Sequence, residues 1–361
     1  MTNKIVFANQ LRGAAALCVL INHWFGFYWR GREVVATATA SPVQPGTEPW
    51  IANLAGTDWH NSGPLGVALF FLISGFVIPF SLPHHSRLSF LAARALRIYP
   101  VYFLALAIDV AAIFRSSQHW GVPVTLTFRQ VLFNALLIND LDALPSIDMV
   151  NWTLAIEVKF YLATALLFAS IQARRLWPAL ALSAVIAAAG WFLVKQRLGD
   201  GNPFFPLAFR LTAGSAFLPF MFIGTAFKFH MEKALSTVGL IAAATMLSGL
   251  SLFAFSYPSR TFADPLSYLY ALILFAAAYA CRHRFRPMAA LDGLAAISYP
   301  LYLVHAILGY VLLKALTLWI GFGFYPALAV TAPSVVVTAA ALHVSAERFG
   351  ISAGRRLSRR P

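Results

Sequence analysis

The sequence predicts an all-α polytopic membrane protein. Of its 361 residues, 60% are apolar and only 11% are charged, against about 45–50% and 25% in soluble domains. Nearly uncharged stretches of the length that crosses a bilayer, roughly 20 residues, recur along almost the whole chain. Because backbone groups in lipid have to pair within their own segment, these stretches are expected to be helices. The composition excludes soluble, disordered, coiled-coil and disulfide-framework classes.

The hydropathy pattern places about ten transmembrane helices. Each is an apolar run that reaches the length of a span and is bounded by more polar sequence. In order, the approximate spans are 8–29, 63–83, 95–115, 150–170, 176–194, 206–227, 236–257, 264–281, 295–316 and 324–345.

The distribution of basic residues predicts the orientation, since Lys and Arg accumulate on the cytoplasmic side. With the N-terminus inside, the inner segments hold 17 of the 27 Lys and Arg residues and the outer segments hold 8. Both termini are therefore expected in the cytoplasm, and ten spans is the even number that this requires. The same rule accounts for the net charge of +14, so no nucleic acid is expected as a partner.

The segments between the spans suggest a single transmembrane unit. Residues 1–346 are expected to form it, and 347–361 a basic cytoplasmic tail that lies against anionic lipids of the inner leaflet. The outer loops 30–62 and 116–149 are long, and the second contains Val131–Ile138. This apolar piece is too short to cross, so we expect it to be re-entrant or to lie at the interface. The first apolar stretch is expected to remain attached as a span rather than to be a cleaved signal peptide.

Charged side chains at bilayer depth cost about 2.5–3.5 kcal/mol each, so those that remain indicate a partner, a cavity or a function. The ionisable residues within the spans are Arg12, His23, Asp109, Glu157, Lys159, His305, Lys314 and His343. Arg12 and His23 are 11 residues apart, which puts both on one helix face with His23 about 16 Å deeper. His23, Glu157 and His305 are expected to meet in one intramembrane cavity.

The other ionisable residues have simpler interpretations. Lys314 is expected to extend outward along its helix, and Asp109 to reach the outer interface from about two turns away. His343 lies near an inner helix end and is expected to be structural. Lys159 is two residues from Glu157, about 200° around the helix, so the two side chains need separate surroundings. A lone membrane histidine often forms only a hydrogen bond between helices.

Five blocks of sequence carry a family resemblance. They are Gln10-Leu11-Arg12-Gly13-Ala14-Ala15-Ala16 followed by His23; Gly66-Val67 with Phe70-Phe71-Leu72-Ile73-Ser74-Gly75-Phe76; Arg94-Ala95-Leu96-Arg97-Ile98-Tyr99-Pro100; Trp152-Thr153-Leu154-Ala155-Ile156-Glu157 with Phe160-Tyr161; and Ile297-Ser298-Tyr299-Pro300-Leu301-Tyr302-Leu303-Val304-His305. In content and order they resemble the acyltransferase-3 family of membrane acyltransferases over most of the chain. The chain departs from many relatives at Val158, where they carry a second acid, and at Lys159, where they carry Gln. No extra extracytoplasmic hydrolase-like domain is matched.

The resemblance implies O-acylation, usually acetylation, of a hydroxyl with acetyl-CoA or another acyl-CoA as the donor. The acceptor would be a sugar of a cell-surface polysaccharide or lipid-linked glycan, or a secreted small molecule, and the location the bacterial cytoplasmic (inner) membrane. No metal is expected, since Cys18 and Cys281 fit no ligand spacing.

Roles for the site residues follow from their chemistry. Arg12, Arg94 and Arg97 are expected to converge at the cytoplasmic mouth and hold the phosphates of CoA, because guanidinium binds phosphate in a bidentate fork. His23 is expected to be the general base, because an imidazole titrates near neutral pH. Glu157 would orient the imidazole or hold the acceptor, and His305 would support either role. Direct transfer is expected ahead of an acyl-His intermediate.

Two other functions fit parts of the pattern. A proton-coupled transporter would also use intramembrane His and Glu, but the halves show no obvious repeat and the Arg cluster faces one side. A non-catalytic receptor or glycan-assembly partner would be indicated by a lost His or Arg, and both Arg12 and His23 are present. The sequence leaves the acceptor, the length of the acyl group and the oligomeric state open.

Overall fold

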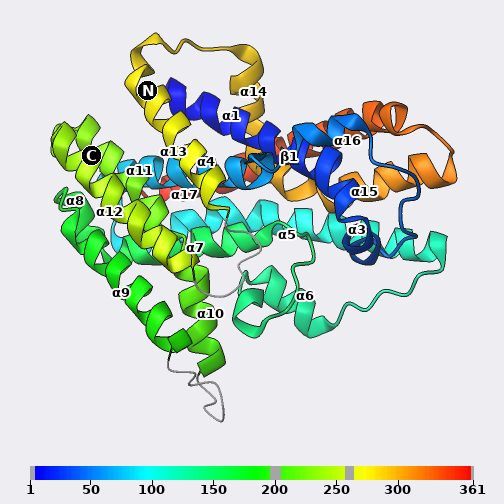
Figure 1. Cartoon of the computed structure of the whole chain (residues 1–361), viewed down its shortest axis with the longest axis horizontal. Helices are drawn as coiled ribbons and strands as arrows, with labels where there is room; N and C mark the ends of the chain where they lie inside the picture. Colours follow the sequence, from blue (N-terminus) through cyan, green and yellow to red (C-terminus); the bar gives the residue numbers. More distant parts are fainter. Residues whose placement is uncertain (1–4, 196–204, 257–263, 359–361) are drawn as a thin grey trace.

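The helices of the protein, in a computed structural model, follow the predicted apolar segments in order. The structure describes residues 5–195, 205–256 and 264–358, and this part of the chain is almost entirely helical, which confirms the all-α class (Figure 1). In chain order the main helices are α1 (Val6–Ile21) with α2 (Tyr28–Arg30), α4 (Ser62–Val77), α5 (Arg87–Trp120), α7 (Asn151–Leu166) with α8 (Phe168–Gln172), α9 (Trp177–Lys195), α10 (Phe205–Ser215) with α11 (Leu218–Met231), α12 (Thr237–Phe255), α13 (Pro265–Ala280), α14 (Ala289–Val304) with α15 (Ile307–Lys314), and α16 (Phe324–Leu342).

Within the described residues, five helical segments are long and apolar enough to cross a membrane, namely Ser62–His84, Arg87–Trp120, Phe205–Met231, Thr237–Phe255 and Phe324–Arg356. A sixth would be α14 together with Ile307–Trp319, a pair bent by 71°. Helices α9 and α13 are apolar but shorter. The chain is therefore a multi-pass membrane protein, while the number of ten spans and the cytoplasmic position of both termini stay predictions.

Close backbone contacts fix helix α4 at the centre of the bundle. It packs against α1, α11 and α13, and α1 also packs along α14 (Figure 1). A Cβ atom on Gly75 of α4 would lie 1.8 Å from the main-chain oxygen of Met221, and one on Gly224 of α11 would lie 2.2 Å from that of Leu72. Small residues allow transmembrane helices to approach this closely. The two facing glycines thus set the distance between α4 and α11.

Helical geometry is irregular at two of the predicted functional residues. A π-helical turn, η1 (Asn22–Phe27), follows α1 and contains His23. Helix α14 ends at Val304 and α15 begins at Ile307, so His305 lies at the break. Turns of π-helix inside α-helices occur frequently at functional sites.

Short elements occupy the two long predicted loops. Segment 30–62 contains α3 (Arg32–Ala38), η2 (Trp50–Leu54) and the antiparallel pair β1 (Gly56–Thr57) and β2 (His60–Asn61). Segment 116–149 contains α6 (Phe128–Ala135) and η4 (Asn139–Asp142). The predicted apolar piece Val131–Ile138 is thus helical as far as Ala135. Buried Asn134 anchors α6, because its Oδ1 accepts a hydrogen bond from Asn151 Nδ2 at 2.7 Å.

Two charged residues lie deeper than the sequence suggests. Lys314 is 1% exposed, and its Nζ donates to Ser41 Oγ at 2.8 Å and to the main-chain oxygen of Pro42 at 2.6 Å. Asp109 is fully buried, beside the Leu308 amide of α15. The expected outward extension of both side chains is wrong, because segment 30–62 folds back to supply Lys314 with acceptors and because α15 covers Asp109.

Ionic contacts fix the end of α11. Glu232 accepts hydrogen bonds from Lys228 Nζ and Arg174 Nε, each at 2.8 Å. Burial acts to raise the pKa of Glu232, but these two hydrogen bonds outweigh it, and the pKa is lowered overall. The pair of contacts ties α11 to the turn between α8 and α9.

The described part of the expected basic tail is helix α17 (Arg348–Arg356), which follows the π-helical turn η7 (His343–Glu347). It packs closely on α5, since a Cβ atom on Gly350 would lie 2.1 Å from the main-chain oxygen of Leu96. His343 Nδ1 lies 2.7 Å from the carboxylate of buried Glu347. The tail thus lies against the start of α5, where the predicted donor-binding arginines are.

Candidate active site

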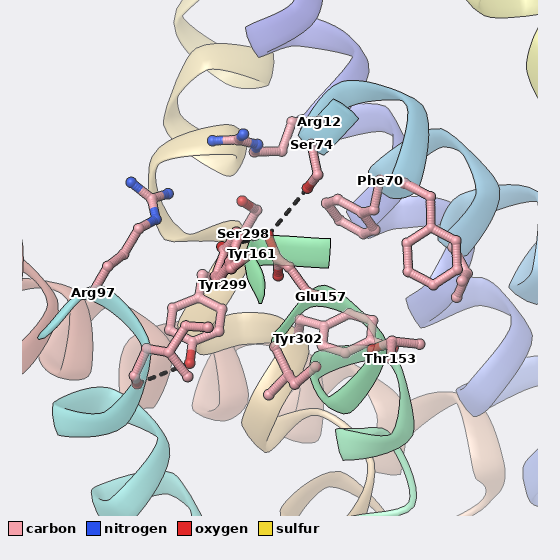
Figure 2. A pocket seen from close by; sticks show the side chains of 14 residues that line it. Arg12, Phe70, Ser74, Arg97, Thr153, Glu157, Tyr161, Ser298, Tyr299 and Tyr302 are labelled. Carbon is pink, nitrogen blue, oxygen red and sulfur yellow. Dashed lines mark hydrogen bonds between the residues drawn. The ribbon is translucent and has the colours of Figure 1, made fainter. Parts of the chain in front are cut away.

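A pocket of about 90 Å³ lies where α1, α4, α5, α7 and α14 meet (Figure 2). All five sequence blocks contribute to its wall. The lining residues are Arg12, Val67, Phe70, Phe71, Ser74, Arg97, Ile98, Thr153, Leu154, Glu157, Tyr161, Ser298, Tyr299 and Tyr302. Blocks that are far apart in the sequence therefore build one site.

Glu157 is held in this pocket by two hydroxyl groups. Its Oε1 accepts hydrogen bonds from Tyr161, one turn later on α7, at 2.7 Å and from Ser74 of α4 at 3.1 Å (Figure 2). Both donors lie within the sequence blocks that carry the family resemblance, but neither is among the predicted site residues. The i, i+4 spacing of Glu157 and Tyr161 is a usable signal for their contact, whereas the contact with Ser74 depends on how α4 packs against α7.

Two guanidinium groups share the pocket with this carboxylate. Arg12 of α1 and Arg97 of α5 are close enough to act on each other electrostatically, and Glu157 acts on Arg12. Figure 2 shows both guanidiniums on the same side of Glu157. Within the described residues neither arginine has a hydrogen bond or an ion pair, and the two hydroxyls hold the carboxylate through Oε1. The pocket therefore presents two cations to a ligand.

Arg94 lies behind the pocket wall. Its guanidinium is 5.5 Å from the ring centre of Phe90 and 5.9 Å from that of Tyr161, distances at which cation–π attraction operates. Burial lowers the pKa of His85, in the turn before α5, and electrostatic interactions with Arg94 and His84 lower it further. Of the three arginines expected to converge, Arg12 and Arg97 line the pocket and Arg94 supports it through Tyr161.

The two predicted histidines face each other. The ring centres of His23 and His305 are 4.7 Å apart, edge to face. His305 is fully buried, and its Nδ1 lies 2.8 Å from the main-chain oxygen of Tyr302. A carbonyl oxygen only accepts, so Nδ1 carries the hydrogen and Nε2 has a lone pair. That Nε2 is buried without a partner among the described residues.

His23 is only partly buried, so of the two imidazoles it is the more accessible. Its Nδ1 lies 2.7 Å from the hydroxyl of Tyr310. Trp24, the next residue, donates from Nε1 to the main-chain oxygen of His305 at 2.9 Å. This bond joins η1 to the break between α14 and α15 and keeps the two histidines together.

The expectation of one cavity for His23, Glu157 and His305 needs correction. The histidines are together, but Glu157 lies with the arginines. Tyr302 lies between the histidines and the Glu157–arginine group. It lines the pocket, and its ring centre is 5.7 Å from that of His305. Its hydroxyl is 2.8 Å from Thr153 Oγ1. Glu157 is one turn further along α7 than Thr153, which places it toward the arginines.

Lys159 and Glu157 have separate surroundings, as their spacing on the helix predicts. Lys159 Nζ lies 2.6 Å from Oδ2 of Asp140, which belongs to η4. The pair ties α7 to η4 and leaves Glu157 alone on the pocket side. The chain thus places a single carboxylate among the residues that line the pocket.

Comparison with known proteins identifies the family. A family profile described as an acyltransferase domain matches residues 5–343. Nodulation protein 10 of Rhizobium leguminosarum bv. viciae is 28% identical over 172 residues, which cover 42% of this chain and 45% of that protein. The match therefore spans less than half the length of this curated relative, and no solved structure matches the chain. Since the family profile covers nearly the whole sequence, the chain belongs to the acyltransferase-3 family.

Proposed function

We propose that the protein moves an acyl group, most simply acetyl, from cytoplasmic acyl-CoA to a hydroxyl group. The acceptor is a sugar of a cell-surface or lipid-linked glycan, or a secreted small molecule, and the location is the bacterial inner membrane. The observation that carries the proposal is a pocket with two arginines that have no hydrogen-bond partner among the described residues, and a pair of facing histidines on the other side of Tyr302. The family assignment favours this over the transporter and receptor hypotheses.

Arg12 and Arg97 are the proposed binding groups for the donor. CoA is a polyanion, and guanidinium groups bind phosphate oxygens through two parallel hydrogen bonds. Neither arginine has to leave a hydrogen-bond partner in the described part of the chain to do so, and Ser74 and Tyr161 hold Glu157 through its Oε1. Arg94 contributes charge from behind Tyr161.

His23 is the proposed general base. It removes the proton of the acceptor hydroxyl as the hydroxyl oxygen attacks the thioester carbonyl carbon. A C–O bond forms, the C–S bond breaks, and the imidazolium returns the proton to the departing thiolate, which leaves as CoA-SH. His305 lies against His23 and supports the imidazole, and Glu157 accepts a hydrogen bond from a substrate group in the pocket.

The proposal is tested with cells that carry or lack the protein. Mass spectrometry of surface glycans and secreted metabolites should show a mass difference of one acyl group, which identifies the acceptor as well as the reaction. His23→Asn keeps size and hydrogen bonding but cannot act as a base near neutral pH. It should insert normally, bind acyl-CoA and lose about 10²–10⁴-fold in rate. An acyl group that is present equally in cells without the protein, or near-normal turnover by His23→Asn, would contradict the proposal.

A further inference from the structure

The hydroxyl of Tyr310 lies between two polar atoms of His23. It is 2.7 Å from the imidazole Nδ1 and 3.4 Å from the main-chain oxygen of the same residue. Tyr310 is fully buried on α15, so the contact joins the π-helical turn η1 to a helix near the other end of the chain. Tyr310 lies outside the five sequence blocks. Its hydroxyl can therefore influence which imidazole nitrogen of His23 carries the hydrogen.

A phenol hydroxyl both accepts and donates a hydrogen bond, whereas a carbonyl oxygen only accepts. The hydroxyl hydrogen of Tyr310 therefore has two acceptors within reach, Nδ1 and the main-chain oxygen of His23. When it points to the main-chain oxygen, the phenol oxygen accepts from Nδ1–H, and Nε2 keeps its lone pair. A general base that works through Nε2 needs this tautomer, because the substrate proton has to arrive at that nitrogen.

The main-chain oxygen of His23 has room for this hydrogen. It accepts the N–H of Tyr28, five residues later, in the π-helical turn, and a carbonyl oxygen has a second lone pair. Packing holds the phenol in place: the ring centre of Tyr310 lies 6.0 Å from the imidazole, with 25° between the planes, and 6.0 Å from the ring of Tyr28. All the partners that the base-competent arrangement needs are thus present.

We infer that Tyr310 is a positioning residue for acyl transfer. By accepting from Nδ1–H and donating to the main-chain oxygen of His23, it holds the imidazole in the tautomer whose Nε2 receives the substrate proton. The inference rests on the proposed function of His23 as the base. Tyr310 itself exchanges no proton with the substrate. His305 is held in the same tautomer by a different acceptor, the main-chain oxygen of Tyr302.

Tyr310→Phe tests the inference, because it removes the hydroxyl and keeps the ring. Tyr28→Phe is the matched control: Tyr28 is equally buried and belongs to the same aromatic group, but its hydroxyl donates to Gln44 Oε1 at 2.7 Å. Both full-length variants are assayed for transfer of ¹⁴C-acetyl from acetyl-CoA to the membrane glycan fraction, and acetyl-CoA binding is measured separately. Tyr310→Phe should lose about ten- to a hundredfold in kcat with acetyl-CoA affinity unchanged, and Tyr28→Phe should stay near wild type.

The tautomer gives a second readout that does not depend on turnover. In protein labelled with ¹⁵N-histidine, the His23 resonances are assigned by their loss in His23→Asn. Wild type should show Nδ1 protonated and Nε2 unprotonated, and Tyr310→Phe should shift the population toward Nε2–H. An unchanged tautomer in Tyr310→Phe, Nε2–H in the wild type, or equal losses of kcat in both Phe variants would overturn the inference. Normal turnover by His23→Asn would instead remove the proposed base, whatever Tyr310→Phe does to the tautomer.

Discussion

Replacing Arg12 or Arg97 by Lys should weaken acyl-CoA binding without changing the charge of the pocket. Lysine keeps the positive charge and the topology signal, but it cannot form the second parallel hydrogen bond to phosphate. A hydrogen bond to a charged group contributes about 1.5–3 kcal/mol. Because neither arginine has a partner among the described residues, no competing contact offsets that loss. Each substitution is therefore expected to raise Kd roughly ten- to a hundredfold, since 1.4 kcal/mol corresponds to a factor of about ten.

The assay is equilibrium binding of acetyl-CoA to the purified protein in lipid nanodiscs, which needs no knowledge of the acceptor. Arg282→Lys is the matched control. Arg282 lies over the Tyr279 ring at 4.4 Å, donates to the Tyr279 main-chain oxygen, and does not line the pocket, so its replacement should leave Kd unchanged. Unaltered affinity in both Arg12→Lys and Arg97→Lys, or an equal loss in Arg282→Lys, would refute the assignment of the donor site.

Three further substitutions follow from single contacts. Tyr161→Phe removes the shorter of the two hydrogen bonds that Glu157 Oε1 accepts. The carboxylate is then held by Ser74 alone and can turn toward the pocket arginines, so the Kd of acetyl-CoA should rise about tenfold. An unchanged Kd would be inconsistent with this. Gly75→Ala places a Cβ atom 1.8 Å from a main-chain oxygen of α11 and should destabilise the protein by at least about 1–3 kcal/mol. Gly249→Ala is the control: its Cβ atom meets nothing within 4 Å, and it should raise the thermal midpoint slightly. Glu232 has a lowered pKa. Its contribution to stability is therefore present above its unfolded pKa of about 4.3 and is lost as the pH falls through the lower folded value. In Glu232→Gln the Tm should fall less steeply with acid than in wild type, and an unaltered slope would contradict this.

The sequence predicts the helices well because their signal is local. Apolar runs of the length of a membrane span coincide with helices throughout the described chain, and the spacing of Lys159 and Glu157 correctly places them in separate surroundings. The depths of Lys314 and Asp109 are predicted wrongly because their burial depends on contacts with residues far away in the sequence. Whether segment 30–62 folds back to offer Ser41 and Pro42 as acceptors is decided by long-range packing, which the pattern around Lys314 does not contain.

The sequence predicts residues that belong to the site, but not which of them lie together. Periodicity places Arg12 and His23 on one face of α1, yet it cannot indicate that Tyr302 separates the histidines from Glu157. The π-helical turn that contains His23 has no recognisable signal, since no Pro or Gly precedes it within the turn before. Tyr310 is one tyrosine in an apolar run, and only the approach of α15 to η1 distinguishes it.

The separation of the two polar groups along α1 fits the shape of the proposed donor. Eleven residues separate Arg12 from His23, which corresponds to about 16 Å along a helix. CoA carries its phosphates at one end and its thioester at the other, joined by a long flexible arm. Phosphates bound at Arg12 and Arg97 would leave the arm to run along the aromatic wall of Phe70 and Tyr302 toward the histidines. Such a wall also excludes water, which would otherwise compete with the acceptor hydroxyl and hydrolyse the thioester. A polar site split into a phosphate end and an imidazole end is therefore suited to the proposed transfer from acyl-CoA, because the wall between the two ends keeps water away from the reacting carbon.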